Sequence, residues 1–180
     1  MVHGGLIGPF PDGRDHDEYD RVRRRVLWAL PTGLYVLGSE AAGRRNLMTL
    51  SWAMQVAMDP KLLAVGVESA AVTHELVRTG GAFALSILAR DDRALVRRFG
   101  KPLVDDGEPG LLAGHEVTTA VTGSPILAVA AAWLDCRVVQ TVDFASHSLF
   151  IGEVVDCAED ADRLAGGVLR MEDTRMSYGG

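Results

Sequence analysis

The stretch "NLMTLSWAMQVAMDP", residues 46–60, carries most of the information about the fold of this 180-residue chain. Small or polar residues alternate along it with bulky apolar ones until Asp59 and Pro60, which is typical of a long strand. Alternate residues of a strand share a face. One face is small and can form hydrogen bonds: Thr49, Ser51, Ala53 and Gln55. The other face is apolar and is predicted to be core: Met48, Leu50, Trp52, Met54 and Val56.

The hydrogen-bonding face has two interpretations. It would suit a flat ligand with polar edges, or it would simply meet water at the edge of a sheet. A second polar feature follows the next apolar strand, because Ser69, Thr73 and His74 stand near the start of a predicted helix. Backbone N–H groups at a helix N-terminus favour a phosphate. The alternative is that Ser69 is an ordinary N-cap residue.

Short strands in hairpin-like order dominate the rest of the chain. We predict strands at 34–39, 46–58, 62–67, 82–88, 116–121, 131–144 and 147–160, with a turn at 143–146, and helices at 15–29, 68–81 and 89–99. The order lacks the βαβ rhythm of a doubly wound sheet. The predicted fold class is therefore mainly β with short helices, arranged as a closed or nearly closed β-barrel. One domain, 1–180, is expected, with residues 1–14 as a flexible N-terminus and 163–180 as a C-terminal tail.

Composition argues against several classes of function. Hydrophobic residues make up 48% and charged residues 23% of the chain, as in a soluble globular protein. The net charge of -6 argues against a nucleic-acid partner, and no apolar run is long enough to predict a membrane span. Cys136 and Cys157 form no C-x-x-C pattern and no secretory signal is evident, so a reduced, cytoplasmic protein is expected. The five His lack metal-ligand spacing, and no metal site is predicted.

The sequence offers no evident acid–base machinery. His147 lies between Ser146 and Ser148, but neighbours along a strand point to opposite faces and cannot form a nucleophile–base pair. Neither a G-x-G-x-x-G nor a G-x-x-x-x-G-K-[ST] motif occurs. A cofactor that carries the chemistry would explain this pattern.

A series of segments resembles a known family. The segments are "PTGLYVLGS", "NLMTLSWAMQVAMDPKLLAVGV", "SAAVTHELVRTGGAFALSIL", "RRF", "GSPIL", "AAWLDCRVV" and "HSLFIGEVVD". In this order they are similar to the flavin reductase-like family of FMN-binding split barrels, which includes the reductase components of two-component flavin monooxygenases. The resemblance spans roughly residues 20–157.

The resemblance implies a homodimer of split β-barrels that binds FMN, with FAD as the alternative flavin. NADH or NADPH would donate hydride to the flavin, and free flavin or a flavin-dependent monooxygenase would accept the electrons. The residues placed around the flavin and its ribityl phosphate are Asn46, Met48, Thr49, Leu50, Ser51, Val67, Glu68, Ser69, Thr73 and His74. His147 matches a family histidine beside the flavin and nicotinamide, and it is the predicted catalytic residue.

Two other functions stay open. The chain could be a flavin-binding electron carrier or flavin-sequestering module without reductase turnover, or a split-barrel relative that binds haem or pyridoxal phosphate. Glu68 supports the first of these, because many relatives have a basic or amide residue in this region and a carboxylate beside a phosphate is unfavourable. If FMN binds, Arg44, Arg45 or an Arg of a second subunit is expected to compensate.

Overall fold

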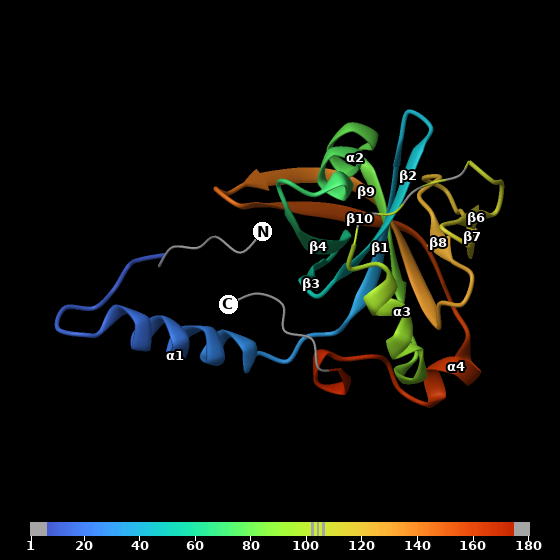
Figure 1. Cartoon of the computed structure of the whole chain (residues 1–180). Helices are drawn as coiled ribbons and strands as arrows, with labels where there is room; N and C mark the ends of the chain where they lie inside the picture. The colour runs from blue at the N-terminus through green and yellow to red at the C-terminus, as the bar shows by residue number, and fades with distance from the viewer. Residues whose placement is uncertain (1–6, 102, 104, 106, 175–180) are drawn as a thin grey trace.

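A seven-stranded antiparallel sheet forms the body of the protein (Figure 1). The structure is a computed structural model that describes residues 7–174 except 102, 104 and 106. The strands lie in the order β2-β1-β5-β9-β10-β4-β3, and their bounds are β1 (Tyr35–Ala41), β2 (Arg44–Leu50), β3 (Ala53–Met58), β4 (Lys61–Glu68), β5 (Ala82–Ile87), β9 (Ala132–Asp143) and β10 (His147–Glu159). A smaller sheet contains β6 (Leu111–Leu112), β7 (His115–Thr118) and β8 (Ile126–Leu127).

Short helices surround the sheet. They are α1 (His16–Trp28), α2 (Val72–Gly80), α3 (Arg93–Arg98) and α4 (Ala161–Ala165), with 3-10 turns at Arg90–Asp92 and Met171–Asp173. Helix α1 begins where the Asp15 side chain accepts a hydrogen bond from the N–H of Glu18, over 2.8 Å. This helix projects away from the barrel in Figure 1, and none of its residues is buried. Among the described residues, no helix is both long and apolar enough to cross a membrane.

One bent stretch of chain joins the two edges of the main sheet. Strands β2 and β3 lie at opposite ends of the strand order, yet only Ser51 and Trp52 separate them in sequence. The two edges must therefore approach each other, which requires the sheet to curl. All neighbouring strands of this sheet pair antiparallel. The result agrees with the predicted barrel of hairpin-connected strands.

Apolar side chains fill the inside of the curled sheet. Phe83 and Phe150 are completely buried there. Cys136 packs in the same cluster, where burial, assisted by the charge of Asp135, raises the pKa of its thiol to about 12. Gly152 is needed for this packing, because a Cβ at that position would lie 2.8 Å from the ring of Phe83.

A second buried cluster connects the barrel to α3 and to the C-terminal part of the chain. Its residues are Leu34, Val36, Leu47, Leu88, Val96, Phe99, Leu112, Leu127 and Leu169. Leu169 belongs to the predicted C-terminal tail, which is thus fastened to the barrel, and the bridge between Gly33 and Arg170 adds backbone pairing. Residues 175–180 of that tail and residues 1–6 of the predicted N-terminus lie outside the described residues.

The apolar face predicted for the 46–58 strand is core only as far as Leu50. Three residues beyond it are exposed: Trp52 (43%), Met54 (65%) and Val56 (45%). The prediction that they are core is wrong. The chain bends at Ser51 and Trp52, and β3 beyond the bend is the last strand of the sheet, with a register shift opposite β4. The prediction from alternating residue types assumes one continuous strand with one buried face, and the bend breaks that assumption.

Helix α2 begins later than the predicted range of 68–81. Its first residue is Val72, and its N-cap is Ala71, which forms no side-chain cap hydrogen bond. The interpretation of Ser69 as the N-cap is therefore wrong. Ser69 is exposed in the turn before the helix, and its N–H donates to the backbone oxygen of Ser146 over 2.9 Å.

Candidate functional site

A cavity of about 430 Å³ lies between β2, the start of α2 and the segment that follows α3. Five of the residues predicted to hold a flavin line it: Asn46, Met48, Thr49, Glu68 and Thr73. The other described lining residues are Leu47, Ala70, Ala71, Val72, Phe99, Gly100 and Lys101. A volume of about 300–1,000 Å³ is usual for the binding site of a small ligand or cofactor.

A buried hydrogen bond fixes one wall of this cavity. The side-chain amide of Asn46 on β2 donates from Nδ2 to Oγ1 of Thr73 on α2, over 2.7 Å. Asn46 is 6% exposed and Thr73 is fully buried, so water does not readily replace either partner. The bond leaves the Asn46 carbonyl oxygen able to accept, and the Thr73 hydroxyl able to donate, a hydrogen bond. The wall is both rigid and polar at this point.

Thr49 fastens β2 to α3 on the other side. Its Oγ1 donates to the backbone oxygen of Val96 over 2.6 Å, and its N–H donates to the backbone oxygen of Phe99 over 3.0 Å. The hydroxyl proton is thus used within the protein, and Thr49 can offer a ligand only an acceptor. Met48 and Phe99 add apolar surface. Mostly apolar walls with a few fixed polar groups are usual in cofactor sites.

Two charged residues are found in the described lining, Glu68 and Lys101. Glu68 is the last residue of β4, and it is exposed. Its backbone oxygen accepts a hydrogen bond from the N–H of Ala71 over 3.0 Å, so the chain turns here into α2. Glu68 therefore lines the cavity where the chain turns from β4 toward the start of α2.

The arginines expected to compensate Glu68 bind other acids. Arg44 forms an ion pair with Glu75 over 3.1 Å. Arg45 holds Asp105 through two hydrogen bonds of 2.7 and 2.9 Å, which keep the pKa of that carboxyl below its usual value. Neither arginine is in the cavity lining. The structure thus does not support compensation from Arg44 or Arg45, and the second-subunit arginine stays a prediction.

A polar network joins α2 to the turn between β9 and β10. Nε2 of His74 lies 2.7 Å from Oγ of Ser148, whose hydroxyl donates to Oδ1 of Asp143 over 2.6 Å. Because a hydroxyl has one proton, the His74 Nε2–H group is the donor to Ser148. Arg78 donates to both Ser148 and Asp143. Burial, followed by the charge of Arg78, lowers the pKa of His74, and Asp143 partly opposes this.

His147 lies at the first position of β10, directly opposite Glu68 in the ladder with β4. Its ring centroid is 4.7 Å from that of Trp52, and its Nδ1 is 2.9 Å from Oγ of Ser146. Trp52 also covers Gly66, since a Cβ at that glycine would lie 3.2 Å from the indole. Gly66, Glu68 and His147 share a face of the sheet. The aromatic pair of His147 and Trp52 therefore lies on the same face as Glu68 of the cavity lining.

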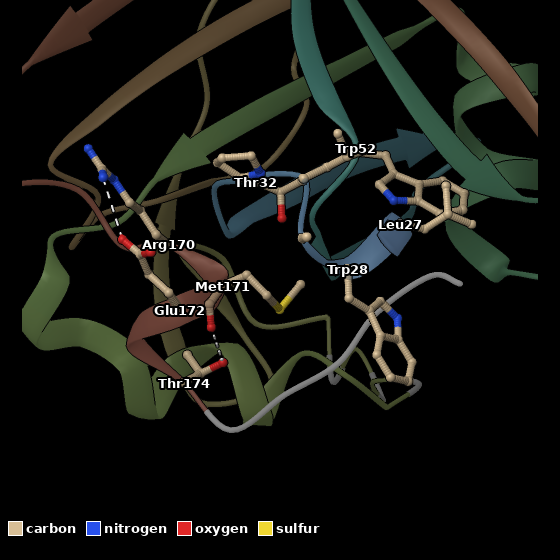
Figure 2. A pocket seen from close by; sticks show the side chains of 11 residues that line it. Leu27, Trp28, Thr32, Trp52, Arg170, Met171, Glu172 and Thr174 are labelled. Carbon is tan, nitrogen blue, oxygen red and sulfur yellow. Dashed lines mark hydrogen bonds and ion pairs between the residues drawn. The ribbon is translucent and has the colours of Figure 1, made fainter. Parts of the chain in front are cut away.

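A second cavity, of about 490 Å³, lies between the end of α1 and the 3-10 turn near the C-terminus (Figure 2). Trp28, Trp52 and Met171 line it, and Figure 2 also shows Arg170 with its ion pair to Glu172 of 3.5 Å. Because Trp52 contacts His147 as well, this indole stands between the histidine and the second cavity. Sequence alternation assigned Trp52 to the core and so missed its place here.

Several predicted site residues are outside the described lining of the first cavity: Leu50, Ser51, Val67, Ser69, His74 and His147. Leu50 and Val67 pack in the barrel core. A role for these residues toward a flavin stays a prediction. Seven lining residues were not among those predicted for the site: Leu47, Ala70, Ala71, Val72, Phe99, Gly100 and Lys101. The first four lie close to predicted site residues in the sequence, whereas Phe99, Gly100 and Lys101 do not. They follow α3 in a segment without a strong pattern, and only the fold brings them to β2.

Comparison with known proteins decides the family. The profile of the flavin reductase like domain matches residues 27–177. The chain belongs to the flavin reductase-like family. This confirms the resemblance seen in the ordered segments. It also places the cavity at β2 within a family of flavin-binding domains.

The chain is similar in sequence to a high molecular weight rubredoxin and to a flavin reductase. The chain is 33% identical over 136 residues to the high molecular weight rubredoxin of Moorella thermoacetica, a match that covers 74% of this chain and 58% of that protein. The chain thus spans less than two thirds of that relative. It is 31% identical over 135 residues to the NADH-dependent flavin reductase StyB of Pseudomonas fluorescens, covering 74% of this chain and 75% of that protein.

A solved structure confirms the fold. The NADH:FAD oxidoreductase SgcE6 of Streptomyces globisporus C-1027 matches with a TM-score of 0.69 and 25% sequence identity, covering 88% of each chain. The fold class predicted from the sequence, mainly β with short helices in a split β-barrel, is therefore confirmed.

Proposed function

We propose that this protein is an NAD(P)H:flavin oxidoreductase, which transfers hydride from NADH or NADPH to a bound flavin. The cavity at β2 carries the proposal. Its wall from Asn46 to Thr49 is rigid and combines polar with apolar groups, and it faces the start of α2 in a flavin-binding family. The likeness to an NADH-dependent flavin reductase supports NADH as a donor.

A flavin suits the groups that line the cavity. Its ring system has a flat apolar body, which would lie against Met48, and a polar edge, which would reach Asn46. The ribityl chain would extend toward Thr73 and the N-terminus of α2, whose backbone N–H groups favour an anionic group. FMN is the flavin that the resemblance implies, with FAD as the alternative.

A bound flavin supplies the redox chemistry, because it accepts hydride and passes electrons to a further acceptor. The residues of the chain hold, orient and shield the reacting rings. Asn46 and Thr73 fix each other and thereby orient the polar edge of the flavin. The bonds of Thr49 keep the wall in place, which favours a close approach of the two rings, about 3–3.5 Å. His147, held against Trp52, positions the nicotinamide, and hydride transfer needs no proton from it.

Free flavin or a flavin-dependent monooxygenase is the proposed electron acceptor. A homodimer is the proposed working unit. Exposed apolar side chains on the edge strand β3 support it, since a second copy would remove Met54, Val56 and Met58 from water.

A flavin-binding electron carrier without NAD(P)H turnover is the second candidate. The likeness to the high molecular weight rubredoxin favours it, as does the acidic Glu68 in the cavity lining. Such a carrier would use the same flavin-binding wall but would have no productive site for a nicotinamide.

Anaerobic absorption spectroscopy tests the proposal. Purified protein is reconstituted with FMN or FAD, and NADH and NADPH are then added separately. We expect the flavin band to bleach with at least one nicotinamide and to return in air. A flavin band that is stable to both nicotinamides but bleaches with dithionite would refute the reductase and support the carrier. A Soret band in the purified protein, or no flavin binding at all, would contradict both.

A further inference from the structure

The neutral polar residues and the acidic residue of the cavity lining lie on different elements. Asn46 and Thr49 give the β2 wall neutral polar groups, whereas Glu68 puts a carboxylate where β4 turns into α2. In the part of the chain that the structure describes, no ion pair or side-chain hydrogen bond engages the Glu68 carboxylate. A negative ligand group near Glu68 would therefore meet an acid that no ion pair among the described residues neutralises.

This part of the lining has few groups that bind a phosphate. Ala70 and Ala71 form the turn into α2, and the N-cap Ala71 provides no side-chain hydrogen bond. Lys101 is the one cation in the described lining. Arg44, the first residue of β2, is not in the described lining and pairs with Glu75 over 3.1 Å. A phosphate here would be repelled by Glu68. It would be attracted by the backbone N–H groups of α2, the Thr73 hydroxyl and Lys101.

Flavins differ in the charge that they would bring to this place. The phosphomonoester of FMN carries nearly two negative charges at neutral pH. Each phosphate of FAD carries one, and riboflavin has none. We propose that Glu68 makes the cavity select against a phosphomonoester, so that riboflavin or FAD is preferred to FMN. What riboflavin and FAD share is a ribityl chain whose attached phosphate, where there is one, carries a single negative charge. This inference rests on the proposed function, because it requires a flavin in the cavity with its ribityl end toward α2.

The expected effect follows from Coulomb's law. Repulsion between a carboxylate and a phosphate a few ångströms apart, in a site partly open to water, weakens binding by about tenfold for a doubly charged group. The repulsion scales with the ligand's charge, so the effect is about threefold for a singly charged group and absent for a neutral one. Removal of Glu68 should therefore improve flavin binding in the order FMN, then FAD, with riboflavin unchanged.

Equilibrium binding of riboflavin, FMN and FAD to the flavin-free protein tests the inference, with flavin fluorescence as the signal. Glu68→Gln removes the charge, and Glu68→Ser repeats this with a different side chain. Glu153→Gln is the matched control, because Glu153 is exposed on β10 opposite Leu62, at the other end of β4. At about 3.3 Å per residue, that position is about 20 Å from Glu68. Thermal unfolding of each variant checks that its fold is kept.

The inference is supported if the wild-type protein binds FMN no more tightly than riboflavin, and if Glu68→Gln improves FMN about tenfold and FAD less. It is overturned if the wild-type protein prefers FMN to riboflavin by tenfold or more. A variant that leaves the FMN-to-riboflavin ratio unchanged, or a control that shifts it equally, overturns it as well. These failures leave the proposed reductase standing if NADH or NADPH still bleaches a bound flavin. If no flavin binds to any of the proteins, the proposed function falls, and the inference falls with it.

Discussion

Replacing Thr73 by Val isolates the hydrogen bond that fixes the cavity wall. Val keeps the shape of Thr but cannot accept, so Nδ2 of the buried Asn46 loses its partner at 2.7 Å. A buried donor without a partner costs about 1–3 kcal/mol of the free energy of unfolding. For a domain of this size, each kcal/mol lowers the unfolding temperature by about 2–4 °C. We therefore expect Thr73→Val to unfold about 2–12 °C lower than the wild-type protein.

A double-mutant cycle separates the hydrogen bond from other effects. Asn46→Leu alone leaves the Thr73 hydroxyl without its donor and is expected to cost a similar amount. The double variant replaces both partners by apolar groups of similar shape, which can be nearly neutral. Urea unfolding followed by circular dichroism should therefore find the double variant more stable than either single variant, by about 1 kcal/mol or more.

Thr141→Val, at an exposed position of β9, is the control and should stay within about 0.5 kcal/mol of the wild-type protein. If the two single effects in the cycle add within about 0.5 kcal/mol, the groups do not interact and the reasoning is refuted.

Three further predictions concern the site. His147→Ala should slow flavin reduction by about one to two orders of magnitude, within the range of positioning and acid–base groups, and should change flavin binding little, as stopped-flow and equilibrium titration measure. Ala at both Ser69 and Thr73 should weaken flavin binding by about 1–3 kcal/mol, and Thr73 should account for most of this because Ser69 is outside the cavity lining. Stability in urea should fall as the pH drops below 6.5, because burial and Arg78 lower the pKa of His74 and the unfolded chain then binds the proton more tightly. His74→Gln should flatten that pH dependence.

Each of these predictions has an outcome that contradicts it. Flavin reduction at the wild-type rate would remove His147 from the site, and a complete loss would mean that it does more than position the nicotinamide. Unchanged flavin affinity in the variant at Ser69 and Thr73 would place the phosphate elsewhere. An equal dependence on pH below 6.5 in wild-type protein and His74→Gln would show that the pKa of His74 is not lowered in the folded state.

Local chemistry allowed part of the site to be predicted from the sequence. An amide at Asn46 and a hydroxyl at Thr49 stand out in an apolar run, and both line the cavity. Thr73 stands out in the same way at a helix start, and it proved to be the partner of Asn46. In each case a polar side chain stands within an apolar pattern. A buried polar group requires a hydrogen-bond partner or a ligand, so its position in the sequence indicates a site.

Other features depend on contacts that no local pattern records. Alternation of residue types predicts that Trp52 is core, but the residue is exposed. The prediction fails because alternation cannot show where a strand bends or becomes a sheet edge. The partners of His74 were missed for a related reason. Ser148 and Asp143 are distant in sequence, and they reach His74 only because β10 pairs with β4 beside the start of α2.

All described residues that line the first cavity come from one unbroken part of the chain, Asn46 to Lys101. His147 and the long β9–β10 hairpin come from a separate, later part. Under the proposed function, one continuous segment would therefore carry the whole described wall of the flavin site. A chimera that takes residues 46–101 from another family member should acquire the donor's preference among flavins while keeping this chain's own histidine on the opposite strand. Variation in flavin preference among relatives would then fall within residues 46–101 rather than in the β9–β10 hairpin.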